Sequence, residues 1–390
     1  MNLHEFQAKS ILSAYAVRCP RGRVAITADE AEAAAHEVGA QNIFVKAQIL
    51  AGARARAGGV HAVRSPEAAR AAAKALLGQR LVTDQTGPAG QLVQRVLVET
   101  GVARAQELYL AMMVDGSTGS LALIGETQGG TDVEERYRRN SFAPQKLLFN
   151  TKGDVLDGDV GRFCRGLGLA HDPAQRCAEI IRNIHRAFVE IDASLIELNP
   201  LAVTDAGELI VLDAKIVLDD NALFRHADLA ELRDRDEADD IELRAQRHQI
   251  NFVRMDGDIG VIVNGAGLGL ATLDLVRDAG GAPANFMDIR TTAKSLDIAQ
   301  GIGLVLDNPR AKVLLVNVYG GGMQPCDTII EGLGIAVRRK GRVLPIVMRL
   351  TGNNEDLARL RLANFNLPIT ECTDMWQAAT RAVAMAQGRS

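Results

Sequence analysis

Residues 259–267 read IGVIVNGAG, and this stretch decides the fold class of the C-terminal part of the chain. A short apolar, β-branched run is followed by a glycine-containing turn and then by the amphipathic segment 268–278. A buried strand that turns sharply into a helix is typical of α/β proteins. The stretch therefore predicts the first strand-turn-helix unit of a parallel sheet.

The same alternation continues to the C-terminus. Apolar runs at 284–289, 313–319 and 343–350 alternate with amphipathic segments at 296–306, 328–338 and 355–363. Each amphipathic segment can cover one face of a sheet, so the pattern predicts a doubly wound, flavodoxin-like domain over residues 248–390.

The N-terminal part has a mixed α+β pattern. A helical start at 5–15 precedes strand candidates at 43–48, 93–100, 107–114, 121–125, 194–198 and 209–212. Several of these strands are neighbours joined by short turns, which favours antiparallel pairing in a domain over residues 1–227. Residues 228–247 are crowded with charges of both signs and are predicted to form a solvated helix or a charged linker.

Composition excludes several classes of function. With 390 residues, 47% of them hydrophobic, the chain resembles an ordinary multidomain globular protein. A net charge of -4 gives no general attraction to nucleic acid or to an anionic membrane. The five cysteines are scattered and the start lacks a signal-peptide pattern, so we expect a cytoplasmic protein with neither kind of partner.

A small, basic segment is the first candidate phosphate site. Residues 45–60 read VKAQILAGARARAGGV, which places Lys46 in an apolar strand before a loop of small residues that carries Arg54. Small residues let backbone N–H groups approach phosphate oxygens, and the two cations add charge and forked donors. The alternative is a solvated basic loop beside a lysine that extends its ammonium to water.

Two polar segments form a candidate metal site. Glu197 and Asn199 share one face of an extended segment, since side chains alternate along a strand, and Asp213 follows the next apolar run. Asn199 and Asp213 could meet from adjacent strands as oxygen ligands for Mg²⁺, which also binds substrate phosphate. A hairpin with polar faces is the alternative.

Segments in family order along nearly the whole chain resemble the β subunit of the succinyl-CoA synthetase family. They are residues 1–9, 78–83 with 85–86, 107–110, 196–200, 220–225, 263–268 and 352–354. The resemblance implies an N-terminal ATP-grasp domain followed by a flavodoxin-like CoA-ligase domain.

The resemblance also implies a role for individual residues. Lys46 would contact the nucleotide phosphates, and the phosphate loop would consist of Ala53, Arg54 and Ala55. Adenosine would be held by Glu99, Glu107 and the backbone of Val102. Mg²⁺ would be bound by Asn199 and Asp213. Glu197 would orient a phosphohistidine from a partner subunit, because a carboxylate can hydrogen-bond to imidazole. Asn264, Gly321, Gly322 and Met323 would contact the carboxylic acid.

The implied reaction converts succinate, ATP and CoA into succinyl-CoA, ADP and phosphate, as in the tricarboxylic acid cycle. ATP would phosphorylate a histidine of an α subunit, the phosphate would pass to the acid, and CoA would displace it. This chain shows no histidine nucleophile motif, so the resemblance implies a heteromer, either αβ or a dimer of αβ. Pro20 lies near the position of the base and favours ATP over GTP.

The sequence departs from the family pattern in the phosphate loop. Residues 53–56 read ARAR where the family usually has Gly-Arg-Gly-Lys, and Leu50 replaces a common histidine. Alanine disfavours the positive φ angles that glycine tolerates. If the loop needs such angles, nucleotide binding is weakened, and a non-catalytic nucleotide-binding subunit becomes the alternative function.

The second departure lies at the predicted acid site. Arg290-Thr291-Thr292 replaces a usual glycine triplet, and the loop 320–327 is one residue longer than in the family. Arg290 could bind an additional carboxylate or hydroxyl of the acid, and Arg349 is a second candidate anchor. Malate, or another dicarboxylate-like acid, is therefore an alternative to succinate.

A dinucleotide-dependent oxidoreductase is a rival from another class. Residues 265–270 read GAGLGL after a predicted strand, but the Rossmann fingerprint GxGxxG requires glycine where Leu270 stands. The sequence therefore favours the ligase.

Overall fold

The computed structural model describes residues 1–88, 90–130, 133, 136, 139, 144–149, 157–234 and 240–389. The chain divides into two compact units, Met1–Glu237 and Ala238–Ser390. Within the predicted linker 228–247, α7 (Ala227–Glu231) belongs to the first unit and α8 (Asp240–Gln246) to the second, while 235–239 lie outside the described residues.

The first unit is built on antiparallel sheets, as the sequence predicts. One sheet has the strand order β1-β6-β2-β3, and the other has the order β11-β10-β7-β8-β9 with β12 also beside β10. The strands are β1 (Gly22–Ala25), β2 (Ile43–Ala47), β3 (Val60–Val63), β4 (Arg80–Leu81), β5 (Gln91–Leu92), β6 (Val96–Thr100), β7 (Gln106–Asp115), β8 (Ser120–Glu126), β9 (Gln145–Leu148), β10 (Ala193–Val203), β11 (Leu209–Val211) and β12 (Ala214–Leu218).

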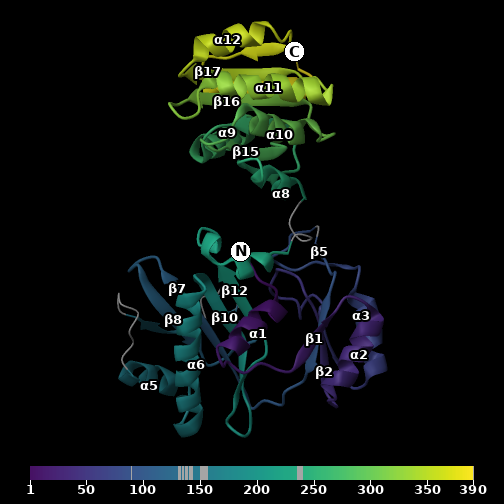
Figure 1. Cartoon of the computed structure of the whole chain (residues 1–390), viewed down its shortest axis with the longest axis vertical. Coiled ribbons are helices and arrows are strands. Elements are labelled where there is room, and N and C mark those ends of the chain that lie inside the picture. Colours follow the sequence, from purple (N-terminus) through teal and green to yellow (C-terminus); the bar gives the residue numbers. More distant parts are fainter. Residues whose placement is uncertain are drawn as a thin grey trace. The chain divides into compact units, whose positions relative to one another are not determined.

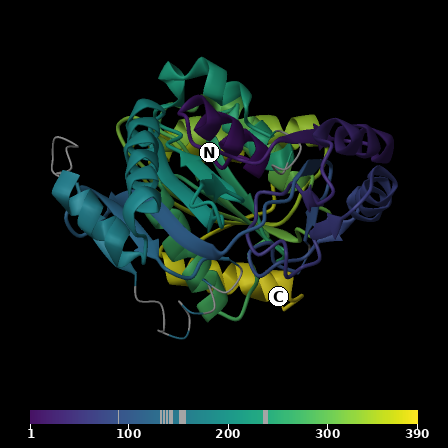
Figure 2. The same cartoon turned by 90° about the horizontal axis from the view of Figure 1, so that it is seen from below.

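Helices cover one face of each sheet (Figure 1). They are α1 (Glu5–Ala14), α2 (Ala28–Val38), α3 (Pro66–Leu76), α5 (Asp157–Gly166), α6 (His171–Glu190), the short 3-10 helix η1 (Leu223–Arg225) and α7. α2 and α3 lie side by side (Figure 2) and bury small alanines such as Ala34 and Ala72, which lets them pack closely. Thr27 and Ser65 cap their N-termini through side-chain oxygens.

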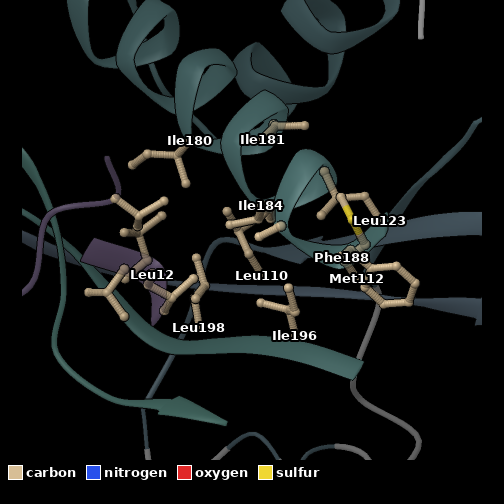
Figure 3. Close-up of a cluster of buried hydrophobic side chains, with 14 of the residues drawn as sticks. Leu12, Leu110, Met112, Leu123, Ile180, Ile181, Ile184, Phe188, Ile196 and Leu198 are labelled. Carbon is tan, nitrogen blue, oxygen red and sulfur yellow. The ribbon is translucent and has the colours of Figure 1, made fainter. Parts of the chain in front are cut away.

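Packing of the larger hydrophobic core, under α6, determines which residues of β10 face away from that core. Figure 3 shows the apolar stripe of α6 against the sheet, with Ile180, Ile181, Ile184 and Phe188 beside Leu110, Met112, Leu123, Ile196 and Leu198. Because side chains alternate along a strand, burying Ile196 and Leu198 turns Glu197 and Asn199 to the other face of β10. By the same rule Val45 enters the smaller core and Lys46 turns away from it.

The second unit has the predicted doubly wound sheet. Its strand order is β13-β15-β14-β16-β17-β18, and all pairs are parallel except β13 with β15. From β14 onward this is the flavodoxin-like order 2-1-3-4-5. The strands are β13 (Ile250–Arg254), β14 (Ile259–Val263), β15 (Asn285–Ile289), β16 (Val313–Gly320), β17 (Ile346–Gly352) and β18 (Ile369–Glu371).

Helices cover both faces of this sheet (Figure 1). α10 (Ser295–Leu306) and α11 (Cys326–Lys340) pack on one face, and α9 (Ala266–Asp278) and α13 (Met375–Ala386) on the other, while α12 (Glu355–Ala363) packs beside α11. The strand order reverses between β14 and β16, where doubly wound sheets bind ligands. No helix of the described residues is long and apolar enough to cross a membrane.

Candidate functional site

A cavity of about 370 Å³ lies in the first unit, between the two sheets, α1 and the loop 49–55. It is lined by every residue that the sequence predicts for the nucleotide, the metal and the phosphohistidine: Lys46, Ala53, Arg54, Ala55, Glu99, Val102, Glu107, Glu197, Asn199 and Asp213. The fold thus brings together residues that lie up to 167 positions apart, from Lys46 to Asp213. Their individual roles remain predictions.

Two lysines and two glutamates form buried ion pairs with one another beside the cavity. Lys46 Nζ lies 2.9 Å from Glu5 Oε1 and 2.6 Å from Glu99 Oε1. Lys9 Nζ lies 2.7 Å from Glu5 Oε1 and 2.6 Å from Glu99 Oε2. Both ammonium groups also donate to the carbonyl oxygen of Leu212. Buried charges need such pairing, because desolvation penalises each of them.

Arg54 joins this cluster to the predicted metal ligand. Its Nη2 lies 2.7 Å from Glu5 Oε2 and 2.7 Å from Asp213 Oδ2, and its Nη1 donates to the carbonyl oxygen of Ala47 at 2.7 Å. Three cations (Lys9, Lys46, Arg54) and three carboxylates (Glu5, Glu99, Asp213) therefore balance one another. We call these six side chains the ion cluster.

The pairing shifts the pKa values of its members. Burial would lower the pKa of Lys46, but the carboxylates of Glu5, Glu99 and Asp213 outweigh burial and raise it. Burial would likewise raise the pKa of Glu5, but Lys46, Lys9 and Arg54 hold it well below its ordinary value. Glu5 and Lys46 are therefore both charged at neutral pH.

Ala53 adopts the left-handed conformation, with φ of 58°. The loop therefore uses a positive φ where the sequence departs from glycine, and an L-residue in this conformation is strained. Ala55 is not among the residues with positive φ. The strain falls at one of the two alanine positions.

Asn199 and Asp213 lie together at the cavity. The Asn199 N–H donates to the Asp213 carbonyl at 3.0 Å, and Asn199 Oδ1 accepts from the Gly130 N–H at 2.7 Å. Two oxygen donors beside a cavity suit Mg²⁺, which completes its shell with phosphate oxygens and water. Within the described ranges no cluster of three or more His, Cys, Asp or Glu side chains could hold a metal alone. The residues thus fit a metal that arrives with a phosphate-bearing substrate.

The residues predicted for adenosine have different surroundings in the cavity. Glu107 is ion-paired with Arg104, and the Gly129 N–H donates to the Glu107 carbonyl at 2.8 Å. Glu99 differs from the expectation in one respect, since its carboxylate binds Lys9 and Lys46 in the ion cluster.

Four residues at this site were missed from the sequence: Glu5, Lys9, Gln48 and Lys215. Gln48 Nε2 donates to Glu5 Oε2 at 3.1 Å, and Gln48 Oε1 accepts from the Phe6 N–H, which holds the first turn of α1 against β2. Only the segment 1–9, noted for its resemblance, drew attention to Glu5 and Lys9. Glu5 and Lys9 pair with each other at i,i+4 spacing, but their other partners, Lys46 and Glu99, lie 41 and 90 positions away, so no local pattern reveals that they belong to the site.

In the second unit, Asn264 connects the two loops at the reversal of strand order. Its Nδ2 donates to the Tyr319 carbonyl at 2.7 Å, and its Oδ1 accepts from the Tyr319 N–H at 2.9 Å. The predicted loop residues Gly321, Gly322 and Met323 follow β16, and Met323 is 71% exposed. These residues meet at the edge of the sheet where a ligand is expected.

Arg290 is held at the same edge by hydrogen bonds. Its Nε and Nη2 donate to Asn251 Oδ1 at 3.0 and 2.8 Å. Asn251 Nδ2 in turn donates to Asp288 Oδ2 at 3.0 Å, and Asp288 Oδ1 accepts from the Gly265 N–H at 2.6 Å. Asn251 lies on β13, the antiparallel edge strand that sequence patterns did not predict. This strand fixes the exposed guanidinium beside the loop that follows β14.

Arg349 lies on β17, in register with Asn317 of β16. Its Nη1 is 3.5 Å from the Val318 carbonyl oxygen, and its buried Nε lacks a hydrogen-bond partner among the residues that the structure describes. No contact among the described residues joins Arg349 to Arg290.

Family models match both parts of the chain. The model described as an ATP-grasp domain matches residues 2–203, and the model described as CoA-ligase matches residues 262–383. A protein of Anaeromyxobacter dehalogenans (strain 2CP-C) named succinate–CoA ligase [ADP-forming] subunit beta is 42% identical over 390 residues, covering 99% of this chain and 100% of its own. A Burkholderia lata protein of the same name is 40% identical over 389 residues, covering 100% of both chains.

A solved structure shares the fold. ATP citrate lyase from Methanothrix soehngenii, in complex with citrate and coenzyme A, matches with a TM-score of 0.76, 17% identity and 99% coverage of both chains. At this identity the likeness shows the fold alone.

We predict that Ala53→Gly stabilises the first unit by about 1 kcal/mol, because glycine relieves the strain of a positive φ by more than it adds to unfolded-state entropy. Ala55→Gly is the matched control, and it should destabilise by about 0.5–1 kcal/mol, since only the entropy term applies there. Denaturant unfolding measures both. Equal destabilisation by the two substitutions would contradict the strain at Ala53.

We predict that Glu5→Gln lowers the free energy of unfolding by about 3–5 kcal/mol, because it leaves buried cations without their carboxylate. It should also make the free energy of unfolding fall less steeply as the pH is lowered into the acid range. The pKa of Glu5 in the folded protein is far below 4.5, so its ionisation stabilises the fold above that pH and the contribution is lost as pH falls. Unfolding titrations from about pH 6 down to about pH 2 test this.

Glu179→Gln, at an exposed position of α6, is the control for this pH series and should leave both quantities unchanged. An acid limb in Glu5→Gln as steep as that of the unsubstituted protein would show that Glu5 is not the group responsible.

Proposed function

This chain belongs to the family of ADP-forming succinate–CoA ligase β subunits, and we propose that it is the nucleotide-binding subunit of an ATP-dependent acid–CoA ligase. The ligase converts a dicarboxylate, ATP and CoA into the acyl-CoA, ADP and phosphate. The observation that carries the proposal is the cavity of the first unit, which gathers the ten residues predicted for ATP, Mg²⁺ and phosphohistidine.

As a β subunit, the chain acts with an α subunit. We further propose that the partner carries the histidine that ATP phosphorylates, and that Glu197 orients the phosphorylated ring at the cavity. The described cysteines are free thiols, which fits the cytoplasmic location that the sequence predicts. Both αβ and a dimer of αβ are compatible with this scheme.

Nucleotide binding requires an exchange of partners by Arg54. Asp213 and Asn199 would hold Mg²⁺, which neutralises phosphate charge and orients the triphosphate. Arg54 now binds Asp213, so its guanidinium must move to the phosphates before that carboxylate can meet the metal.

The acid would bind in the second unit at Asn264, Gly321, Gly322 and Met323. Arg290 would bind a carboxylate or hydroxyl of the acid, since Asn251 already holds its guanidinium at this edge of the sheet. Malate remains a candidate beside succinate for this reason. Arg349 is the second proposed anchor, and its buried Nε offers one donor.

A non-catalytic nucleotide-binding subunit is the second candidate function. Strain at Ala53 favours it, because the phosphate loop then binds less tightly than a glycine loop. The complete ion cluster and the paired Asn199 and Asp213 support the active ligase instead.

We expect [γ-³²P]ATP with Mg²⁺ to label the co-expressed α partner, and one dicarboxylate plus CoA to discharge the label. The acid that discharges it is the substrate, with succinate and malate tested side by side. A competent partner that takes no label from this chain would favour the non-catalytic subunit. Label that no acid discharges would contradict the proposed substrate class.

We expect Arg290→Ala to raise the KM for the acid about 10- to 100-fold, the effect of losing a charge-assisted hydrogen bond. Labelling of the partner by ATP should not change, because that step occurs in the first unit. Arg310→Ala removes another exposed arginine of the second unit and should change neither quantity. An unchanged KM for every acid would show that Arg290 does not contact the substrate.

A further inference from the structure

Four basic residues line the cavity of the first unit: Lys46, Arg54, Arg104 and Lys215. Lys46 is paired with Glu5 and Glu99, Arg54 with Glu5 and Asp213, and Arg104 with Glu107. The side chain of Lys215 makes no hydrogen bond or ion pair with any residue in the described part of the chain. Among the described residues, it is the one lining cation that is held in no ion pair.

The strand register places Lys215 beside the proposed transfer residue. Lys215 on β12 is the Cα partner of Glu197 on β10. Side chains directly opposite one another in an antiparallel pair project from the same face. Ala214 and Ile216 enter the core, so Lys215 projects from the opposite face, as Asp213 does. Asp213, Lys215, Glu197 and Asn199 thus share the face that borders the cavity.

An ammonium group that forms no ion pair affects how strongly the cavity attracts the negative charge of a triphosphate. The ion cluster is balanced three against three, so it offers little net attraction to the negative charge of a triphosphate. Arg104 is balanced by Glu107 in the same way. Lys215 therefore adds a positive charge to the cavity that no carboxylate of the described residues holds in an ion pair, although Glu197 lies opposite it in the strand register.

We propose that Lys215 is a further catalytic residue, which stabilises the phosphoryl group as it passes from ATP to the partner's histidine. The inference rests on the proposed function. A neutral imidazole nitrogen attacks the γ-phosphorus and forms a P–N bond. The bond from phosphorus to the β,γ-bridging oxygen breaks, and ADP leaves with that electron pair. The proton on the other ring nitrogen stays on that nitrogen, and this N–H group donates a hydrogen bond to the Glu197 carboxylate.

The position of Lys215 suits this step better than substrate binding alone. Lys46 and Arg54 lie with the ion cluster and the phosphate loop, whereas Lys215 lies opposite Glu197, where the imidazole is proposed to arrive. Charge on the transferred group and on the leaving oxygen develops in the transition state, and a preorganised cation stabilises it there. Lys215 therefore contributes mainly to the rate of transfer and little to the affinity for ATP.

The test compares Lys215→Met and Lys215→Arg with the unsubstituted chain, each co-expressed with the α partner. Single-turnover transfer from [γ-³²P]ATP and equilibrium binding of Mg²⁺-ATP are measured on the same samples. Lys215→Met should slow labelling about 100-fold while ATP affinity changes less than about threefold. Lys215→Arg keeps the charge and should recover most of the rate. Lys146→Met, at an exposed lysine paired with Asp115 outside the cavity, is the control.

The outcomes separate this inference from the proposed function. If the unsubstituted complex takes no label, the proposed function fails. If it takes label and Lys215→Met labels within about twofold of it, Lys215 has no part in the transfer. A loss of rate in Lys215→Met that Lys215→Arg does not recover, together with a lower unfolding midpoint in both, assigns Lys215 a structural role and overturns the inference.

Discussion

The ion cluster is the interaction on which the rest of the first unit depends. Six charged side chains come from α1, β2, β6, the phosphate loop and Asp213, which directly precedes β12. All but Asp213 are buried, and each buried charge is stable away from water only because the others are present. The cluster therefore holds these elements in one arrangement around the cavity. The same charges that fix the fold are the ones that a nucleotide and its metal must rearrange.

The second constraint is the alternation of side chains in β10 and β12. Burying Ile196, Leu198, Ala214 and Ile216 under α6 turns the polar residues between them toward the cavity. One face of this sheet thus packs in the hydrophobic core, and the other face borders the cavity. The second unit uses a different device, since its proposed acid site lies at the reversal of strand order and depends on the hydrogen bonds of Asn264, Asp288 and Asn251.

Sequence patterns predicted the parts of this architecture that are encoded locally. The alternation of apolar runs and amphipathic segments after residue 258 predicted the flavodoxin-like sheet, and residue chemistry indicated Lys46, Arg54, Asn199 and Asp213. Glu5 and Lys9 were missed because Lys46 and Glu99, the partners that place them at the site, are distant in the chain. β13 was missed because an antiparallel edge strand lies outside the strand-helix alternation. The φ of Ala53 could not be predicted, since alanine itself disfavours it.

The most direct test of this account is a crystal structure of the α-β complex with Mg²⁺ and a non-hydrolysable ATP analogue. The account predicts that the Asp213 carboxylate and Asn199 Oδ1 bind the metal, and that the Arg54 guanidinium has left Asp213 for the phosphates. Nucleotide bound elsewhere, with Arg54 still 2.7 Å from Asp213, would contradict the claim that the ion cluster is the nucleotide site.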